Sequence, residues 1–459
     1  MELLVIGLYL SAVLGVGFWS ARKSKSSTED YILAGRTLTL PVFIATLVAT
    51  WYGGILGVGE FSYTYGLSNW LVLGLPYYLF AFLYALFFAQ RIRAETDLTL
   101  PDRLEKIYGR KAALFGGFLV FLITNPAPYV LILGVLLQWV TGWNLPLCVS
   151  LSVFFSAVYL YRGGFRADVW TDVFEFFLMF AGIFVILPFA YKRWGGLDFL
   201  RAHLPATHLS IPGRLSWGTV LAWYFIALWT FVDPAFYQRC SAARNGETAK
   251  KGMLLSIPFW FLFDAMTTTA GLYARAALPD LAEPMKAYPA LARMLLPAWA
   301  RGLFFAGMLA TAMSTLNTLT FLSAMSAGKD VLARWRNVPE ASQEDWVRKG
   351  LLPVSLFSIF LALCLRSVVG LWYAIGACTI PALLFPVWSS YYPSLRIRAG
   401  WVLAAMISGW GISTFSLILG RVRFLGASPG YLFGLEPIYL GLMVSGMIWL
   451  GGLWRARSA

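Results

Sequence analysis

The sequence predicts an all-α integral membrane protein with about thirteen transmembrane helices, and three observations support this fold class. First, 59% of the 459 residues are hydrophobic and only 13% are charged, whereas soluble proteins carry roughly 45–50% and about 25%. Second, apolar runs of the about 20 residues that cross a bilayer recur along the whole chain. Third, two of these runs are interrupted at corresponding positions. So few charges cannot cover a water-exposed surface, which excludes soluble enzymes, disordered scaffolds and nucleic-acid-binding proteins.

Each predicted span is an apolar run bounded by polar or charged residues. The thirteen runs are 3–20, 40–66, 69–91, 112–140, 144–161, 168–191, 215–237, 250–275, 297–327, 350–367, 369–391, 399–419 and 431–453. Two hydrophilic segments between them, 99–110 and 328–350, are expected to form short helices at the membrane surface.

The charges around the first run predict the orientation. Only Glu2 is charged before this run, whereas Arg22, Lys23 and Lys25 follow it. This is the reverse of a secretory signal and indicates an uncleaved helix with its N-terminus outside. Roughly two thirds of the 36 Lys and Arg residues then fall on the inner side. We expect a multi-pass protein of the cell (inner) membrane with a cytoplasmic C-terminus, whose net charge of +14 reflects topology.

The reactive residue types argue against an enzyme. The four cysteines lie far apart, and both histidines, His203 and His208, fall in one polar loop. No nucleophile–base pair or metal-ligand cluster is predicted at membrane depth.

Two spans are predicted to be broken helices. In the second span, four glycines follow Trp51 and Tyr52 within seven residues, and Glu60 comes directly after them. Glycine in a membrane helix often marks a packing face, which is the alternative here. The seventh span contains Asp233 followed by Pro234. Proline removes a backbone donor, and a carboxylate inside a membrane is costly and often functional.

The two interrupted spans are five helices apart, which predicts an inverted repeat. Five is an odd number, so the second set of five helices enters the membrane from the opposite side. The expected organisation is an extra helix and inner loop, a first five-helix repeat, an outer loop, a second repeat and two C-terminal helices, at 1–38, 39–192, 193–214, 215–391 and 392–459.

A stripe of hydroxyl groups on the ninth span could hold a monovalent cation. Thr311, Ser314, Thr315 and Thr318 follow the i, i+3, i+4, i+7 spacing of one helix face. The broken second span would supply carbonyl oxygens that lack helical partners. The alternative is that these hydroxyls bond back to carbonyls of their own helix.

Four segments together resemble the sodium:solute symporter family. They are DYILAGR (30–36), YRGGFRADVWTDVFEF (161–176), FYQRCSAARNGETAKKG (236–252) and AGMLATAMSTLNTL (306–319). The resemblance implies a LeuT-type fold with two five-helix inverted repeats. It also implies alternating access in which inward sodium movement drives uptake of a small solute, with Na⁺ as the coupling ion.

The resemblance implies which residues hold sodium. The ligands would be the carbonyls of Ala49, Tyr52 and Thr311 and the hydroxyls of Ser314 and Thr315. Family members usually have alanine where Thr311 stands, a change that spares a carbonyl ligand. A second sodium would use Asp172 and Thr318; alternatively, Asp172 pairs with Arg166.

The segment ATWYGG (49–54) resembles the high-affinity choline branch of the family. That resemblance places the solute beside Gly53 and among Trp51, Tyr77 and Tyr129, in a cage that attracts a quaternary ammonium group. Asp233 stands where the last aromatic residue of that cage would fall. A cationic or zwitterionic amine is therefore favoured. Asp233 could instead serve the broken helix, bind sugar hydroxyls or exchange protons, and sugars, polyols and carboxylates remain alternatives.

Two further acidic residues are candidates for gating or coupling. Glu60 either gates the outer end of the second span or reaches water there. Asp264 is either a proton or ion site or the partner of Thr267 or Thr268. Arg239 is expected to secure the inner end of the seventh span.

Two rival functions remain open at this point: a proton-coupled transporter, and a transporter-like sensor. A sensor would need a separate partner, because the sequence ends about six residues past the last span. The partners otherwise expected are the solute, sodium and membrane lipid, and a monomer is compatible with all of these features.

Overall fold

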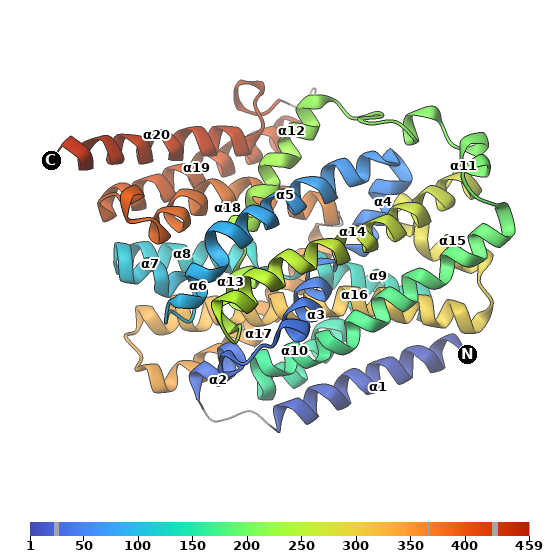
Figure 1. Ribbon diagram of the computed structural model, residues 1–459, viewed down its shortest axis with the longest axis horizontal. Coiled ribbons are helices and arrows are strands. Elements are labelled where there is room, and N and C mark those ends of the chain that lie inside the picture. Colours follow the sequence, from blue (N-terminus) through green and yellow to red (C-terminus); the bar gives the residue numbers. More distant parts are fainter. Residues whose placement is uncertain (23–26, 366, 425–429, 459) are drawn as a thin grey trace.

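The computed structural model describes residues 1–22, 27–365, 367–424 and 430–458, so the predicted topology markers Lys23 and Lys25 lie outside the described residues. In the described part all regular secondary structure is helical, apart from one bridge between Leu38 and Ala243. The long helices run side by side, and the two termini lie at opposite ends of the bundle (Figure 1). An odd number of crossings requires this arrangement of the ends.

The predicted spans are present as helices. Some helices and helix chains of the described residues are long and apolar enough to cross a membrane. Two of them consist of several short helices: η2 (Trp70–Gly74), α5 (Leu75–Tyr84), η3 (Ala85–Ala89) and α6 (Gln90–Ala94) form one, and α12 (Trp217–Ile226), η5 (Ala227–Phe231) and α13 (Pro234–Ala242) form the other. The rest are α1 (Glu2–Ala21), α8 (Arg110–Ile123) with α9 (Ala127–Thr141), α10 (Leu145–Trp194), α14 (Gly246–Ala277), α16 (Ala298–Met325) with η7 (Ser326–Ala333), α17 (Gln343–Cys364), α18 (Val368–Tyr391), α19 (Ala399–Phe424) and α20 (Pro437–Ser458).

Shorter helices connect these spans. They are α2 (Thr28–Leu33), η1 (Ala34–Arg36), α7 (Leu100–Tyr108), α11 (Leu197–His203), η4 (Ala206–His208), η6 (Pro284–Lys286), α15 (Ala287–Leu295), η8 (Glu340–Ser342), η9 (Pro393–Leu395) and η10 (Leu432–Gly434).

The count of spans among the described residues depends on two bends. Eleven helices pass the length and apolarity test, and a bent pair, α3 (Leu40–Trp51) and α4 (Ile55–Tyr65), makes twelve. The 50 residues of α10 would extend about 75 Å if straight, far beyond a hydrocarbon core of about 30 Å. However, Gly164 inside α10 is not helical, with φ 51° and ψ −143°. Dividing α10 there gives the predicted thirteen.

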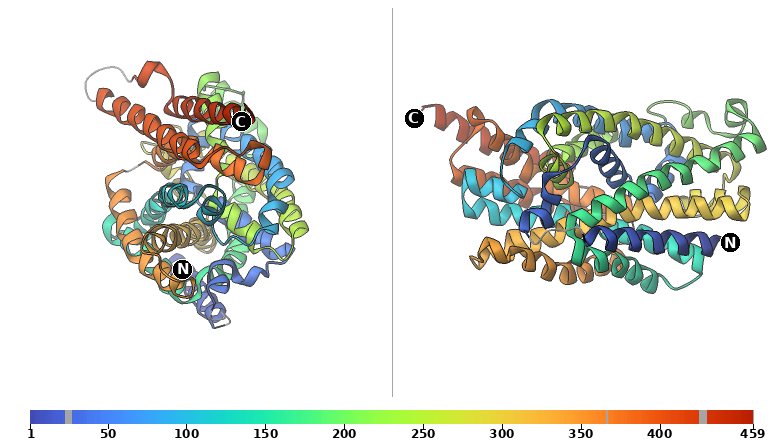
Figure 2. Two further views of the ribbon diagram at one scale, coloured as in Figure 1. Left: turned by 90° about the vertical axis from the view of Figure 1, so that its left-hand side faces the viewer. Right: turned by 60° about the horizontal axis from the view of Figure 1, so that its bottom comes forward.

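The bundle has two clear edges. Seen end-on, α19 and α20 pack together on one edge and α1 lies on the opposite edge (Figure 2). Between them, α16 is buried along nearly its whole length. The side chains of α16 therefore meet other helices on every side, which makes it the central element for a site inside the membrane.

The break between α3 and α4 is bent by 60° and depends on two glycines. A Cβ atom on Gly53 would collide with the side chain of Thr315, and one on Gly54 would collide with the ring of Trp372. Glycine is required here because α16 and α18 approach the backbone so closely. The sequence suggested either a broken helix or a glycine packing face at this point, and the structure has both: the span bends here, and its glycines pack closely against α16 and α18.

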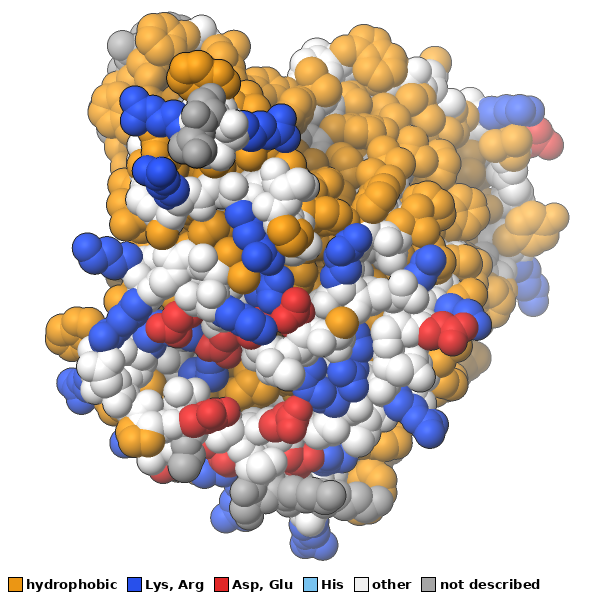
Figure 3. Space-filling model, turned by 60° about the vertical axis from the view of Figure 1, so that its left-hand side comes forward, with side chains coloured by type: hydrophobic (Ala, Val, Ile, Leu, Met, Phe, Trp, Pro, Cys, Tyr) orange, Lys and Arg blue, Asp and Glu red, His pale blue; other side chains and the backbone are white. Residues whose placement is uncertain are grey.

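One end of the bundle carries a network of ion pairs. Figure 3 looks toward this end and shows Lys, Arg, Asp and Glu gathered between apolar flanks. There Asp102 of α7 accepts a hydrogen bond from Lys329 (2.7 Å) and another from Arg334. Burial opposes the charged form of Asp102, but Lys329 and Arg334 outweigh it and hold the pKa of this carboxyl below its ordinary value. The stabilisation is therefore present at neutral pH and weakens as the pH falls through that pKa.

The two predicted surface helices have different outcomes. The segment 99–110 forms α7, whose first turn carries a capping box of Thr99 and Asp102. The segment 328–350 is not a separate helix: its first part continues α16 as η7, and its last part begins α17. The buried Lys329 explains the difference, because its bonds to Asp102 hold the extension of α16 against α7.

We predict that Gly307→Ala destabilises the fold. A Cβ atom on Gly307 would lie 2.7 Å from the Cα atom of Gly182 on α10, where α10 and α16 make their closest approach. Overpacking of this kind costs about 1–3 kcal/mol, which thermal unfolding in detergent would detect. Gly411→Ala on α19 is the control, because nothing lies within 4 Å of its new methyl group. Equal melting temperatures for the two variants would contradict this account.

Candidate functional site

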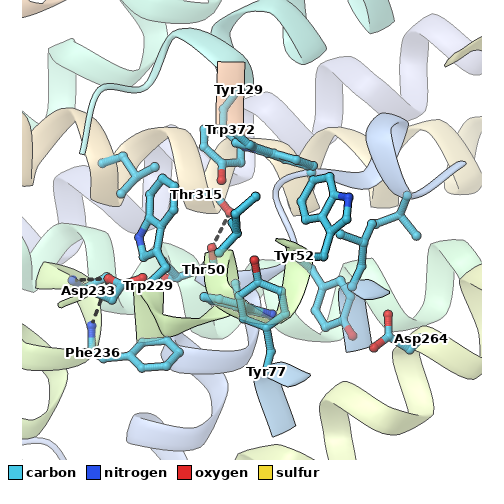
Figure 4. Close-up of a pocket in the computed structure, with 18 residues that line it drawn as sticks. Thr50, Tyr52, Tyr77, Tyr129, Trp229, Asp233, Phe236, Asp264, Thr315 and Trp372 are labelled. Atoms are coloured by element: carbon cyan, nitrogen blue, oxygen red, sulfur yellow. Dashed lines mark hydrogen bonds between the residues drawn. The ribbon is translucent and has the colours of Figure 1, made fainter. Parts of the chain in front are cut away.

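A pocket lies where the two interrupted spans meet (Figure 4). Its walls come from α3, α4, η2, α5, α9, α12, η5, α13, α14, α16 and α18, and eight of its 18 lining residues are aromatic. The aromatic lining residues are Trp51, Tyr52, Tyr77, Tyr129, Trp223, Trp229, Phe236 and Trp372; the polar ones include Thr50, Asp233, Asp264 and Thr315. The structure therefore gathers the predicted residues Trp51, Tyr77, Tyr129 and Asp233 around one space.

Asp233 occupies the break before α13. One of its carboxylate oxygens accepts hydrogen bonds from the backbone N–H groups of Ala235 (2.7 Å) and Phe236 (3.4 Å), which caps the helix. Its other oxygen accepts no hydrogen bond from the residues that the structure describes. Asp233 thus serves the broken helix, as one alternative expected, and also presents a carboxylate to the pocket.

The aromatic residues form a connected floor. The ring of Trp51 lies 4.9 Å from Tyr77, 5.2 Å from Phe236 and 5.7 Å from Trp260, measured between ring centroids. Phe236 and Trp260 are nearly parallel, with centroids 5.8 Å apart. Two further lining residues, Tyr129 and Trp372, contact each other, with their ring centroids 6.2 Å apart. Such faces attract cations and accommodate flat or methylated groups.

The hydroxyl stripe of α16 faces other helices. Ser314 donates to Asp172 on α10 (2.5 Å), Thr315 donates to the carbonyl of Thr50 on α3 (2.5 Å), and Thr318 donates to Asp168 on α10 (2.7 Å). By contrast, Thr311 donates back to Gly307 of its own helix (2.7 Å), as the alternative interpretation expected. The carbonyl of Thr311 lies 3.5 Å from the hydroxyl of Thr315.

These contacts place the proposed sodium ligands at one junction. Ala49 directly precedes Thr50 at the end of α3, and Tyr52 follows two residues after Thr50. The next residue, Gly53, packs against Thr315. The hydroxyl of Tyr52 points elsewhere and donates to the carbonyl of Trp260 (2.8 Å). The break in α3 and the stripe on α16 are therefore in direct contact, which is the arrangement a shared cation would need.

Arg239 lies where a second sodium was expected. A single guanidinium nitrogen, Nη2, is 2.6 Å from Thr318, 2.9 Å from Thr50, and 3.1 Å from both Asp168 and Asp172. The side chain is fully buried. Asp172 and Thr318 therefore contact a positive charge that belongs to the protein itself, and Arg239 does more than secure the end of its span.

The expected alternative partner of Asp172 is wrong. Arg166 bonds to Asp30 and to the carbonyl of Ala34 (3.0 Å), so it faces away from Asp172. The reason is the bend of α10 at Gly164, which directs the following turn toward the loop before α3. Arg166 and Asp172 are only six residues apart in the sequence, but that closeness did not show in which direction the Arg166 side chain points.

Asp168 and Glu175 are buried residues that the sequence interpretation missed. Together with Asp172 they stand at i, i+4 and i+7 on α10, and all three are fully buried. Glu175 accepts a hydrogen bond from Tyr9 of α1 (2.7 Å). The helical spacing was a usable signal, but Arg239, the cation that pairs with Asp168 and Asp172, comes from a distant helix.

The two acidic candidates for gating behave differently. Glu60 lies half-buried on α4 and is absent from the pocket lining among the described residues. Asp264 lines the pocket and accepts a hydrogen bond from Tyr78 of α5. Of the two expected partners, Thr267 donates to the backbone carbonyl of Asp264 (3.2 Å) and not to its carboxylate. Thr268 accepts from Asn69 (3.0 Å) instead.

Trp229 and Trp372 are pocket residues that the sequence did not single out. They lie on η5 and α18, and an apolar run gives no sign of which of its aromatic residues faces a cavity. The break at 124–126 between α8 and α9 was also missed. Its signal was available, since Pro126 follows Asn125, whose side chain accepts from the N–H of Ala127 (3.0 Å) and starts the helix that carries Tyr129.

The comparisons with known proteins agree with this geometry. The family model described as "Sodium:solute symporter family" matches residues 31–388. The chain belongs to this family, and it is a multi-pass Na⁺-coupled solute symporter and not an enzyme.

Two curated relatives illustrate the range of that family. The chain is 25% identical over 435 residues to the high-affinity choline transporter 1 of Caenorhabditis elegans, covering 84% of this chain and 72% of the relative. It is 26% identical over 492 residues to the sodium/glucose cotransporter 4 of Mus musculus, covering 92% and 68%.

The fold is similar to solved transporter structures. An outward-open Na⁺-coupled sialic acid symporter superposes with a TM-score of 0.79 at 17% identity, covering 100% of this chain and 97% of that one. A nucleobase-cation-symport-1 family transporter gives a TM-score of 0.60 at 14% identity, covering 93% and 94%. These likenesses establish the LeuT-type fold that the sequence predicted.

We predict that Arg239→Met strongly destabilises the protein. Removing one partner of a buried ion pair leaves uncompensated charge and costs about 3–5 kcal/mol. Thermal unfolding would measure the loss, and adding Asp172→Asn to the same chain should recover part of it. Lys251→Met, which breaks an exposed pair with Glu247, is the control and should change little. An Arg239→Met variant as stable as that control would refute the charge balance described here.

Proposed function

We propose that this symporter takes up a cationic or zwitterionic amine together with sodium. The observation that carries the proposal is Asp233, a carboxylate with one oxygen left for a ligand, at the edge of an aromatic pocket. An ammonium group would pair with this carboxylate while its alkyl substituents lie against aromatic faces. A sugar would need several donors and acceptors, and the pocket lining is mainly aromatic and aliphatic.

Sodium is proposed to bind at the junction of α3 and α16. Its ligands would be the carbonyls of Ala49, Tyr52 and Thr311 and the hydroxyls of Ser314 and Thr315. The contact between Thr315 and Thr50 supports this placement, because it brings both elements within bonding distance. Asp172 and Thr318 are assigned instead to Arg239, so a single sodium is proposed.

Alternating access would use the two broken spans. Sodium would tie α16 to the broken span formed by α3 and α4 and complete the pocket; the repeats, proposed at 39–192 and 215–391, would then rock and release both ligands inward. We propose that the N-terminus lies outside and the C-terminus in the cytoplasm, in the cell (inner) membrane. Glu60 is assigned to the outer end of the path.

The driving force is sufficient for concentrating a nutrient or an osmolyte. The membrane potential supplies about 2.3 kcal/mol per charge per 100 mV, and a tenfold sodium gradient adds about 1.4 kcal/mol. One sodium ion can therefore sustain solute accumulation on the order of several hundredfold.

We expect amines to stabilise the purified protein against heat in sodium but not in potassium. The panel would include amines, amino acids, sugars, polyols and carboxylates, each tested in both salts. Ser314→Ala/Thr315→Ala should abolish the sodium dependence, because it removes both hydroxyl ligands. Ser358→Ala removes another buried hydroxyl, one that bonds only to its own helix, and should leave the dependence intact.

The panel also tests the alternatives. A sugar or carboxylate that stabilises in sodium, with no response to amines, would refute the amine assignment and retain the sodium site. A response that is indifferent to sodium but changes with pH would refute the sodium site and favour proton coupling. Stabilisation by a solute that proteoliposomes do not accumulate would favour a sensor.

We further predict that Asp233→Asn lowers amine affinity at least tenfold while preserving the fold. Asparagine is as good an N-cap as aspartate, so α13 keeps its first turn but the pocket loses its charge. Equilibrium binding in sodium would measure the change. Asp280→Asn makes the same chemical change at an exposed carboxylate and should have no effect. Unchanged amine binding in Asp233→Asn would remove Asp233 from the site.

A further inference from the structure

We infer that the solute carries two cationic centres, as an α,ω-diamine does, with one ammonium group at Asp233 and the other at Asp264. This inference rests on the amine site of the proposed function and narrows the class of amine. It starts from the presence of two carboxylates in one pocket: Asp233 and Asp264 both line it, although their side chains come from different spans.

Neither carboxylate has a cationic partner among the described residues. Asp30, Asp168, Asp172 and Asp330 are buried acidic residues that form ion pairs with Lys or Arg. Asp264 is 3% exposed, accepts a hydrogen bond from Tyr78 and has the hydroxyl of Tyr52 as a second polar neighbour. A buried carboxylate without a partner is costly. Glu175 on α10 also has no cationic partner among the described residues, but it accepts a hydrogen bond from Tyr9 (2.7 Å) and is not among the residues that line the pocket. Asp233 and Asp264 are the two carboxylates that a ligand in the pocket reaches.

An aromatic floor runs from one carboxylate to the other. It begins at Phe236, whose N–H bonds to Asp233, and continues through Trp51 at 5.2 Å. It then reaches Trp260 at 5.7 Å from Trp51, and Trp260 stands one helical turn before Asp264 on α14.

Figure 4 shows Asp233 and Asp264 at opposite sides of the pocket, with Tyr77 and Tyr52 between them. Tyr52 is fixed by its bond to the carbonyl of Trp260 (2.8 Å). The space between the carboxylates is thus bordered by rings whose faces suit methylene groups and attract ammonium groups.

A diamine matches this pattern better than a monoamine. Its two ammonium groups would neutralise both carboxylates, and its methylene chain would cover the rings between them. A monoamine would satisfy one carboxylate and leave the other buried and unpaired. The bond from Tyr78 to Oδ2 fixes the orientation of the Asp264 carboxyl group at the wall of the pocket.

The first test compares matched pairs of probes in sodium: butylamine against diaminobutane, and hexylamine against diaminohexane. We expect at least one diamine to bind at least tenfold more tightly than its monoamine. In Asp264→Asn this ratio should fall toward one, because the amide keeps a hydrogen bond to Tyr78 but carries no charge. Asp280→Asn, with an exposed carboxylate removed, should retain the ratio of the unmodified protein.

The second test needs no variant and therefore survives if Asp264→Asn fails to fold. In proteoliposomes, the charge moved per molecule of labelled solute should be one unit larger for the diamine than for its monoamine. Equal charge per solute would overturn the inference, because it would mean that the second ammonium group enters without its charge.

The outcomes separate this inference from the function on which it rests. Monoamines that bind in sodium as tightly as diamines, or an unchanged ratio in Asp264→Asn, would overturn the two-centre solute and leave the amine symporter standing. Binding of a sugar with no binding of either kind of amine would overturn both. Monoamine uptake that releases a proton from the pocket would also overturn the inference. It would mean that a proton, and not a second ammonium group, neutralises the second carboxylate.

Discussion

A helix that stops in the middle of a membrane leaves backbone carbonyls that lipid cannot satisfy, and the rest of this structure is arranged around that constraint. At the end of α3 the carbonyl of Thr50 accepts the hydroxyl of Thr315, so α16 provides the partner that the next helical turn would have provided. The contact is possible only because Gly53 has no side chain. The same junction supplies the oxygen atoms to which we assign sodium. The break in the helix and the proposed sodium site are therefore one feature.

At the second break, before α13, the unpaired backbone groups are satisfied by a side chain and not by a neighbouring helix. Asp233 caps α13 with one carboxylate oxygen, which replaces the hydrogen bonds lost where the span unwinds. The cost of this solution is a negative charge at membrane depth. That charge becomes useful when the ligand is a cation, and the surrounding rings strengthen the attraction by excluding water.

Buried charge is managed in two ways within the same bundle. On α10 the carboxylates of Asp168 and Asp172 are matched to Arg239, which also gathers the hydroxyls of Thr50 and Thr318. In the pocket, Asp233 and Asp264 have no such match among the described residues. We therefore assign the first two carboxylates to holding helices together and the two in the pocket to the proposed transport of a cation.

The sequence by itself determined the membrane class, the thirteen spans, both interruptions and the hydroxyl stripe, and the family match and fold likeness confirm the resemblance it carried. These features are local: an apolar run, four crowded glycines, an Asp-Pro pair and an i, i+3, i+4, i+7 spacing act over a few turns of chain. Only the tertiary structure decided that Asp172 meets Arg239 and not Arg166, that the carboxylate of Asp264 meets Tyr78, and that Trp372 and Trp229 border the pocket. Those contacts join helices far apart in the chain. Their partners depend on how each helix is rotated and bent by its neighbours, as at Gly164, and hydrophobic periodicity does not encode rotation in a helix that is apolar on every side.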